Sequence, residues 1–260
     1  MAYYRIEYYS KALHRTTGFE MLIPNDYREE QEVPSTPMKT LFLLHGYTGK
    51  AGNWVPEGLP EKYNFAIVMP SCENGFYLNG LATGHDYQTM TGEELVDYVR
   101  STFRLALRPE DTFIAGLSMG GFGALHTGLA YPDTFGKVAA LSSAFIHHEV
   151  AKMEPGGGNS VANYEYYRQC FGDPATLLER DENPETLVRK LKAAGKKIPD
   201  LFLACGTEDF LIEPNRAMHR FLEEQEVPHV YLEGPGIHDM VFWSVYIAKA
   251  IRWMFGDPED

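Results

Sequence analysis

A serine between two glycines, in the stretch Gly116-Leu-Ser118-Met-Gly120, constrains the fold of this chain more than any other feature. The apolar run 112–115 before it predicts a short strand, and the residues after it predict a helix to about Ala130. Glycines at this spacing allow a sharp strand-to-helix turn, because neighbouring backbone passes too close for a Cβ atom. Such a turn pushes the serine hydroxyl into solvent, so we predict that Ser118 is a nucleophile.

The composition limits the class of protein. A chain of 260 residues with 44% hydrophobic content can bury one large core, so we predict one domain over 1–260. A formal net charge of −13 argues against a nucleic-acid partner and against an anionic membrane surface. Three cysteines without framework spacing predict free thiols, and the N-terminus shows no signal peptide, so we expect a cytoplasmic protein.

Apolar runs and helical patterns alternate along most of the chain. Residues 3–9 and 19–23 alternate in polarity and predict a half-buried antiparallel hairpin, which a loop from Pro24 to Pro37 follows. Further strands are predicted at 39–45, 63–69, 112–115, 138–141, 201–205 and 229–232. Strands that alternate with helices predict an α/β fold, with a mostly parallel sheet and helices on both faces.

Capping residues predict where several helices begin. Thr91 and Glu94 have the spacing of a capping box, which predicts a helix from Thr91. A final helix is predicted from Met240 to Phe255, with Asp239 as its cap. Its apolar stripe comprises Val241, Val245 and Ala248.

The segment from Ala144 to about Ile198 differs from its surroundings. It is richer in charge, and its two short helices are predicted to start at Asp173-Pro174 and Asn183-Pro184. Gly195 is predicted to end the second of them. We interpret the segment as a cap-like insertion over the top of the sheet, not as a second domain.

A serine hydroxyl needs a base to remove its proton, and the base needs a third group to orient it. In a parallel sheet such groups gather beyond the carboxyl ends of the strands. Asp209 follows the strand 201–205 and His238 follows the strand 229–232, so we predict the triad Ser118, Asp209 and His238. Glu208 is the alternative acid.

A tetrahedral intermediate needs backbone N–H donors directed at its oxyanion. The residue after the nucleophile, Met119, is expected to supply one donor, and Tyr47, in the loop after the strand 39–45, the other. His45 is expected to support this loop.

Aromatic side chains lie in segments that should border the site. We predict Trp54, Phe76 and Tyr77 as substrate-binding residues, and His147 of the insertion as a further substrate contact. Aromatic faces suit sugars or phenolic acyl groups.

Four motifs together resemble the esterase D-type family of esterases: Leu-Leu-His45-Gly-Tyr-Thr-Gly with Asn53-Trp54, Gly-Leu-Ser118-Met-Gly-Gly-Phe-Gly-Ala, Cys205-Gly-Thr-Glu-Asp209-Phe and Gly236-Ile-His238-Asp. The chain is most similar to bacterial tributyrin esterases (EstA-like), and less closely to acetylxylan and feruloyl esterases. The resemblance implies an α/β-hydrolase fold, no metal or organic cofactor, and the triad given above. S-formylglutathione hydrolases are also related, but their cysteine-containing oxyanion-loop pattern is not seen after Gly46.

We therefore expect a serine esterase that hydrolyses short-chain esters, from acetyl to butyryl, with acetylated oligosaccharides among the candidate substrates. The alternatives are a feruloyl esterase and an acyltransferase that uses the same triad. The expected partner is a small-molecule ester, and a homo-oligomer is left open.

Overall fold

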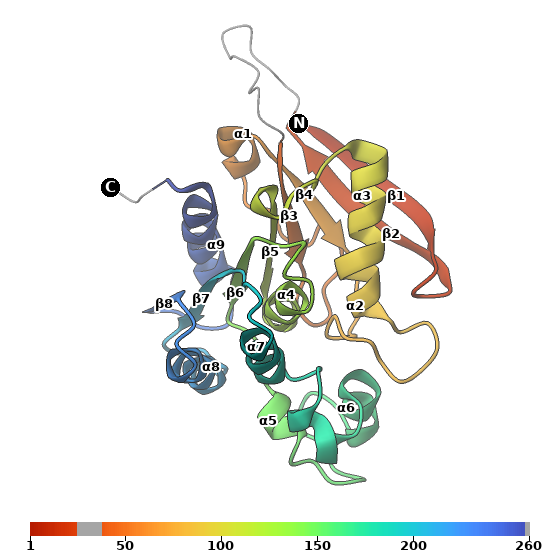
Figure 1. Ribbon diagram of the computed structural model, residues 1–260, viewed down its shortest axis with the longest axis vertical. Helices are drawn as coiled ribbons and strands as arrows, with labels where there is room; N and C mark the ends of the chain where they lie inside the picture. The colour runs from red at the N-terminus through yellow and green to blue at the C-terminus, as the bar shows by residue number, and fades with distance from the viewer. Residues whose placement is uncertain (25–37, 258–260) are drawn as a thin grey trace, which may run out of the picture.

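The computed structural model describes residues 1–24 and 38–257, so the loop predicted from Pro24 to Pro37 lies almost wholly outside the described residues. Its centre is one sheet in the order β1-β2-β4-β3-β5-β6-β7-β8 (Figure 1). The strands are β1 (Ala2–Ser10), β2 (Arg15–Ile23), β3 (Lys39–Leu44), β4 (Phe65–Pro70), β5 (Thr112–Leu117), β6 (Lys137–Leu141), β7 (Asp200–Gly206) and β8 (His229–Gly234).

The sheet is parallel from β4 to β8 and antiparallel only at its N-terminal edge. There β1 and β2 form the predicted hairpin, in which Ala2 pairs with Ile23 and Ser10 with Arg15. Because β3, β5, β7 and β8 are parallel, the loops that follow them emerge at one edge of the sheet. The mostly parallel α/β fold predicted from the sequence is confirmed.

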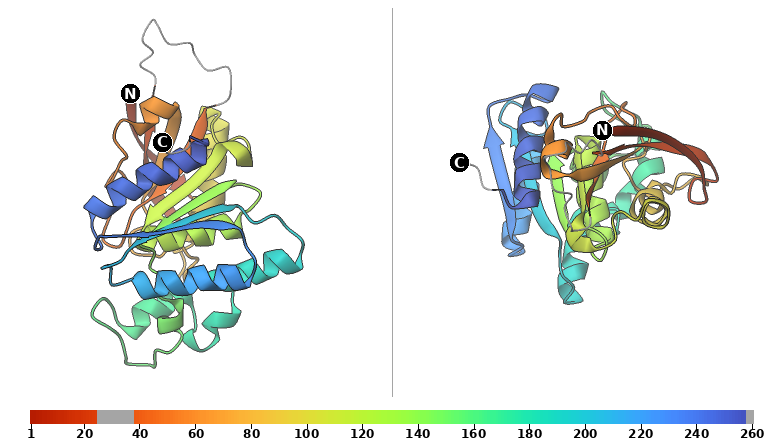
Figure 2. Two further views of the ribbon diagram at one scale, coloured as in Figure 1. Left: turned by 90° about the vertical axis from the view of Figure 1, so that its left-hand side faces the viewer. Right: turned by 90° about the horizontal axis from the view of Figure 1, so that it is seen from above.

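Helices cover both faces of this sheet, and each face has its own buried core. Figure 2 shows α9 and α8 on opposite sides of β7 and β8. The face with α9 carries α1 (Leu59–Tyr63) and α9 (Met240–Phe255); the other carries α3 (Leu95–Phe103), α4 (Met119–Ala130) and α8 (Ile212–Glu224). Within the described ranges, no helix combines the length and the apolar character needed to cross a bilayer.

The helix predicted from Thr91 begins earlier. A short helix, α2 (Tyr87–Thr89), continues through a π-helical turn, η1 (Met90–Glu94), into α3, so Thr91 lies inside the helical run and does not cap it. The Glu94 carboxylate instead accepts hydrogen bonds from the Ser10 hydroxyl and the Lys11 amide. Glu94 therefore ties this helix to the N-terminal hairpin.

The final helix has the predicted bounds and cap, since the Asp239 side chain accepts hydrogen bonds from the Val241 and Phe242 amides. The predicted stripe is not the face that packs on the sheet, because Val241 and Val245 are 76% and 51% exposed. The buried side chains are Phe242, Trp243, Tyr246, Ile247, Ala250, Ile251 and Met254.

The segment 144–198 has two parts with different packing. Its first part holds α5 (His147–Val150) and α6 (Tyr164–Phe171), which lie together at one end of the molecule (Figure 1). Its second part holds a 3-10 helix, η3 (Pro174–Glu179), and α7 (Pro184–Ala193), which packs against α4. Asp173 and Asn183 cap these two elements, as predicted.

Candidate active site

Ser118 occupies a strained turn between β5 and α4. Its φ of 56° and ψ of −120° are unusual for a residue with a side chain. A Cβ on Gly116 would lie 2.1 Å from the Gly120 carbonyl oxygen, and one on Gly120 would lie 2.5 Å from the Leu44 carbonyl oxygen. Only glycine fits at these two positions, so the turn has the geometry predicted for a nucleophile elbow.

The side chains of Ser118, His238 and Asp209 form one hydrogen-bonded chain. The Nε2 atom of His238 lies 2.9 Å from Ser118 Oγ, and its Nδ1 atom lies 2.8 Å from Asp209 Oδ2. The Glu208 carboxylate is not part of this chain, since it accepts a hydrogen bond from the Gly236 amide at 2.6 Å. The structure therefore joins the three side chains selected from the sequence, with Asp209 and not Glu208 on the histidine.

Asp209 is 2% exposed, which would normally disfavour its charged form. Burial raises the pKa of the Asp209 carboxyl, but hydrogen bonds from His238 and the Leu211 amide outweigh it, so the pKa lies below its ordinary value. The carboxylate therefore stays ionised, which holds the His238 ring with Nδ1 protonated and Nε2 available to accept the proton of Ser118.

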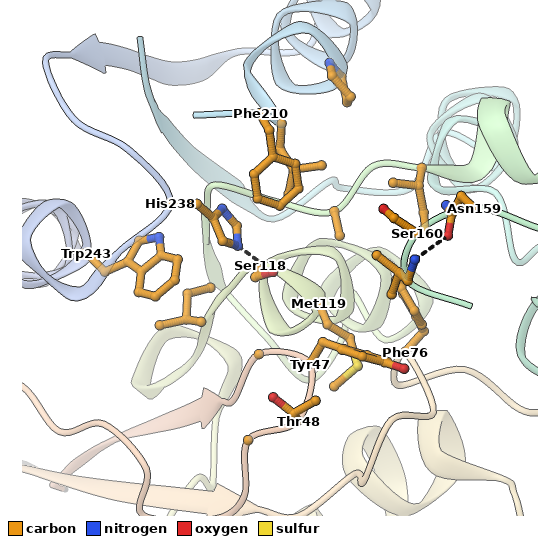
Figure 3. A pocket seen from close by; sticks show the side chains of 18 of the residues that line it. Tyr47, Thr48, Phe76, Ser118, Met119, Asn159, Ser160, Phe210, His238 and Trp243 are labelled. Atoms are coloured by element: carbon orange, nitrogen blue, oxygen red, sulfur yellow. Dashed lines mark hydrogen bonds between the residues drawn. The ribbon is translucent and has the colours of Figure 1, made fainter. Parts of the chain in front are cut away.

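Two backbone amides near Ser118 are free to donate. Met119 is the first residue of α4, and first-turn amides have no partner within a helix. The Tyr47 amide donates no hydrogen bond to any of the residues the structure describes. Both residues line the cavity above Ser118, as expected for oxyanion-hole donors, and Figure 3 shows them on the same side of the serine.

His45 and Tyr77 support the loop that carries Tyr47. The Nδ1 atom of His45 lies 2.8 Å from the Gly46 carbonyl oxygen, and its Nε2 atom accepts a hydrogen bond from the Cys72 amide. The Tyr77 hydroxyl donates to the His45 carbonyl oxygen at 3.2 Å. Sequence reasoning expected this role for His45 but not for Tyr77.

A cavity of about 630 Å³ opens above Ser118. His238 forms part of its wall, and the rings of Phe210 and Trp243 lie 4.6 Å and 4.8 Å from the His238 ring, centroid to centroid (Figure 3). A polar wall faces them across the serine, formed by Asn159 and Ser160 of the segment 144–198. The cavity thus has an apolar side and a polar side.

Two of the four predicted substrate-binding residues, Trp54 and Phe76, line this cavity. The structure does not place the other two at the cavity: Tyr77 is fully buried and His147 is 1% exposed, and neither is among the residues that line it. The rings of Phe210 and Trp243 were missed. Phe210 directly follows Asp209, and that adjacency was a usable signal for its position at the cavity.

Comparisons with known proteins agree with this geometry. A family model described as Putative esterase matches residues 10–254. An acetyl esterase of Caldicellulosiruptor saccharolyticus is 40% identical in an alignment of 261 positions that covers 98% of each chain. Two solved Staphylococcus aureus structures each align over 98% of both chains: the substrate-bound fluorophosphonate-binding serine hydrolase FphF, 29% identical with a TM-score of 0.84, and the S-formylglutathione hydrolase FrmB, 30% identical with a TM-score of 0.82. The chain therefore belongs to the Putative esterase family and is a carboxylic ester hydrolase.

Proposed function

We propose that this serine esterase hydrolyses short-chain esters, from acetyl to butyryl, through an acyl-serine intermediate. Ser118 is the nucleophile, His238 the general base and acid, and Asp209 the residue that orients the histidine. The observation that carries these roles is the distance of 2.9 Å between His238 Nε2 and Ser118 Oγ, with Asp209 on the opposite ring nitrogen.

The reaction proceeds in two steps, formation of the acyl-serine and its hydrolysis. His238 Nε2 takes the proton as Ser118 Oγ bonds to the ester carbonyl carbon, and the Tyr47 and Met119 amides donate to the resulting oxyanion. The intermediate collapses, the carbon–oxygen bond to the alcohol breaks, and the alcohol leaves with the proton from His238. Water then gives a proton to His238 and attacks the acyl-serine; release of the acid returns that proton to Ser118.

The shape of the cavity supports a small acyl group on a larger alcohol. A volume of about 630 Å³ far exceeds what an acetyl or butyryl group fills. Its polar wall includes Asn159, Ser160 and Glu149. The Asn159 amide is held by hydrogen bonds within the protein, one of them to Glu149, so the Ser160 hydroxyl and the Glu149 carboxylate are the groups that suit the hydroxyls of a sugar. The 40% identical relative is an acetyl esterase, which agrees with a short acyl group.

The aromatic lining favours a second candidate. Trp54, Phe76, Phe210 and Trp243 surround the same space, and flat aromatic walls would also accept a feruloyl group. The FrmB relative adds a thioester to the substrates worth testing. An acyltransferase would use the same residues but pass the acyl group to an alcohol in place of water.

A substrate panel tests these assignments. We expect 4-nitrophenyl acetate and butyrate to be hydrolysed with higher kcat/KM than a longer-chain ester, methyl ferulate or S-formylglutathione, and an acetylated xylo-oligosaccharide to be deacetylated. Methyl ferulate as the best substrate would support the second candidate instead. An added acceptor alcohol that diverts product into a new ester would indicate acyl transfer.

Covalent labelling tests the nucleophile separately. A fluorophosphonate probe should label the enzyme at one site, and Ser118→Ala should abolish both the labelling and the hydrolysis. Labelling that persists in Ser118→Ala would contradict the assigned nucleophile.

We also propose that the enzyme works in the cytoplasm. Cys72, Cys170 and Cys205 are all buried and free, which supports a reducing compartment.

A further inference from the structure

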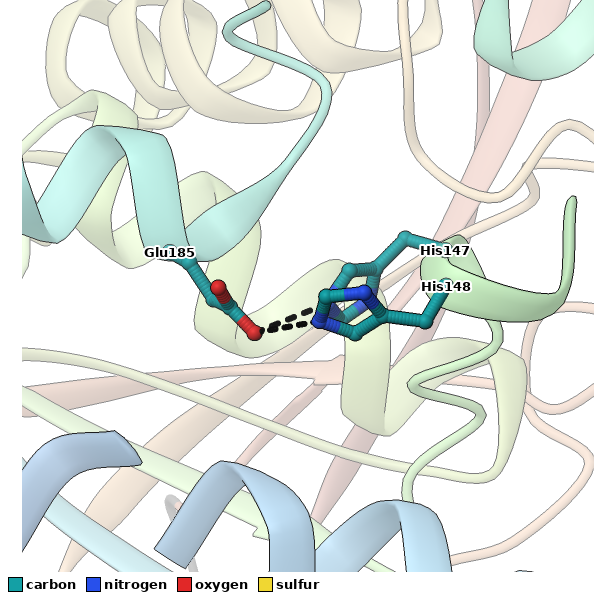
Figure 4. A group of neighbouring side chains, drawn as sticks. All are labelled: His147, His148 and Glu185. Carbon is teal, nitrogen blue, oxygen red and sulfur yellow. Dashed lines mark hydrogen bonds and ion pairs between the residues drawn. The ribbon is translucent and has the colours of Figure 1, made fainter. Parts of the chain in front are cut away.

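Two histidines and a glutamate converge outside the catalytic cavity. His147 and His148 stand at the start of α5, and both rings turn toward Glu185 in the first turn of α7 (Figure 4). Their Nε2 atoms lie 3.5 Å and 2.7 Å from the same oxygen, Glu185 Oε1. Within residues 1–24 and 38–257, this is the only place where three or more His, Cys, Asp or Glu side chains bring their potential ligand atoms close enough together to hold one metal ion.

Hydrogen bonding alone leaves His147 poorly satisfied. The distance of 3.5 Å exceeds the usual range of about 2.7–3.2 Å for an N–H···O bond. The other ring nitrogen, Nδ1, is buried with no partner among the described residues, and the residue is only 1% exposed, so solvent does not reach it. A buried imidazole in this state costs free energy unless another group satisfies it.

A metal ion at the point where the three side chains converge would give His147 Nε2 the close partner that the 3.5 Å contact with Glu185 does not provide, whereas Nδ1 would remain without a partner among the described residues. Tetrahedral Zn²⁺ with nitrogen and oxygen ligands at about 2.0–2.2 Å separates those ligand atoms by roughly 3.3–3.6 Å. The three ligand atoms here already lie within 4.8 Å of one another. The His148 side chain is 47% exposed, so it has room for the small adjustment that equal metal–ligand distances require.

The surroundings hold the Glu185 carboxylate in place and leave room for a fourth ligand of the ion. Arg189 Nη2 lies 3.0 Å from Glu185 Oε2, which leaves Oε1 for the ion. A cavity of about 160 Å³ adjoins the three side chains, with Glu213 in its lining, and it has room for a coordinated water. Two imidazoles and one carboxylate suit zinc-class ions, whereas Mg²⁺ and Ca²⁺ prefer oxygen ligands alone.

We propose that His147, His148 and Glu185 bind one Zn²⁺-class ion that fastens α5 to α7. Ile146 and Glu149 flank the two histidines and line the catalytic cavity, so the ion would stiffen the wall formed by the insertion. It takes no part in ester hydrolysis, and the inference does not depend on the proposed substrate. It departs from the absence of a metal implied by the sequence resemblance.

Zinc titration of chelator-treated enzyme tests the site. We expect one equivalent of Zn²⁺ to bind in calorimetry, and Co²⁺ in its place to give the visible absorption of a tetrahedral site. His148→Ala should weaken binding by about 100-fold or more, because loss of even a ligand's supporting partner costs about 10- to 100-fold. Glu185→Gln should weaken it similarly.

A matched control uses the other close histidine pair, in which His219 Nδ1 lies 2.7 Å from His229 Nε2. His229→Gln should keep full affinity. Zn²⁺ should raise the Tm of the wild type and of His229→Gln but not that of His148→Ala, whose metal-free esterase activity shows that it is folded. No stoichiometric binding in the wild type, undiminished binding in His148→Ala, or binding lost only in His229→Gln would each overturn the proposal.

Discussion

The Nε2 atom of His45 accepts a hydrogen bond from the Cys72 amide at 3.0 Å, which ties the loop after β3 to the loop after β4. Burial lowers the pKa of His45, against the opposing effect of its hydrogen bond to the Gly46 carbonyl. The ring is therefore neutral, donating from Nδ1 and accepting at Nε2. Tyr47, two residues further on, carries one of the two amides assigned to the oxyanion, so His45 is a positioning residue for that amide.

His45→Leu should lower kcat by about 10- to 100-fold, because full removal of an oxyanion donor typically costs about 100- to 1,000-fold and the amide would be displaced but not deleted. KM should change little, since His45 does not line the cavity. Steady-state kinetics with 4-nitrophenyl acetate would measure both. A rise in KM at unchanged kcat would show that the loop binds substrate and does not stabilise the oxyanion.

Asp209→Asn should lower kcat by about 10,000-fold, because an amide in place of the carboxylate no longer holds His238 in the productive tautomer. Glu208→Gln is the matched control, since Glu208 is the neighbouring acid and its carboxylate bonds to the Gly236 amide and to Thr207, not to His238. That variant should keep activity within about tenfold of the wild type, because the glutamine oxygen can still accept from the Gly236 amide and only a charge-assisted hydrogen bond is weakened. Equal losses in the two variants would refute the assignment of Asp209.

Gly116→Ala should destabilise the fold, because its Cβ would lie 2.1 Å from the Gly120 carbonyl oxygen and neither backbone can move without opening the elbow. We expect a loss of about 3 kcal/mol or more in the free energy of unfolding, as for severe overpacking. Gly195→Ala is the control, since that glycine has open space and a φ of +61°. It should cost only about 1–2 kcal/mol of backbone strain. Urea denaturation would compare the two variants, and equal losses would contradict the steric explanation.

The triad was predictable because parallel strands determine where their loops emerge. Once 201–205 and 229–232 are read as neighbouring parallel strands, Asp209 and His238 must lie at the same edge as Ser118. The three residues could therefore be selected from the order of the strands alone, without knowledge of side-chain packing.

Positions that depend on packing between distant segments were not predictable. The final helix is apolar on several faces, so its pattern did not show that Trp243 and not Val245 faces inward. His147 lies in the predicted insertion, but its ring turns toward Glu185 on α7, and local sequence does not reveal that juxtaposition.

The buried ring of His126 should make stability depend on pH. His126 is 1% exposed, its Nε2 atom lies 2.7 Å from the Asp181 carbonyl oxygen, and its Nδ1 atom has no partner among the described residues. Burial lowers the pKa of His126 to about 4, with smaller opposing effects from Asp181. In the unfolded chain a histidine has a pKa of about 6.5. Below that pH the unfolded state binds the proton and the folded state does not, so stability falls from pH 6.5 to 4 and levels off below.

The shift in the pKa of His126 corresponds to a loss of about 3 kcal/mol in the free energy of unfolding across this window. Urea denaturation at several pH values, with EDTA present, should show a shallower loss for His126→Leu than for the wild type, although the variant will be less stable at pH 7 because the Asp181 carbonyl loses its donor. Parallel curves for the two proteins would show that His126 is not the group that titrates.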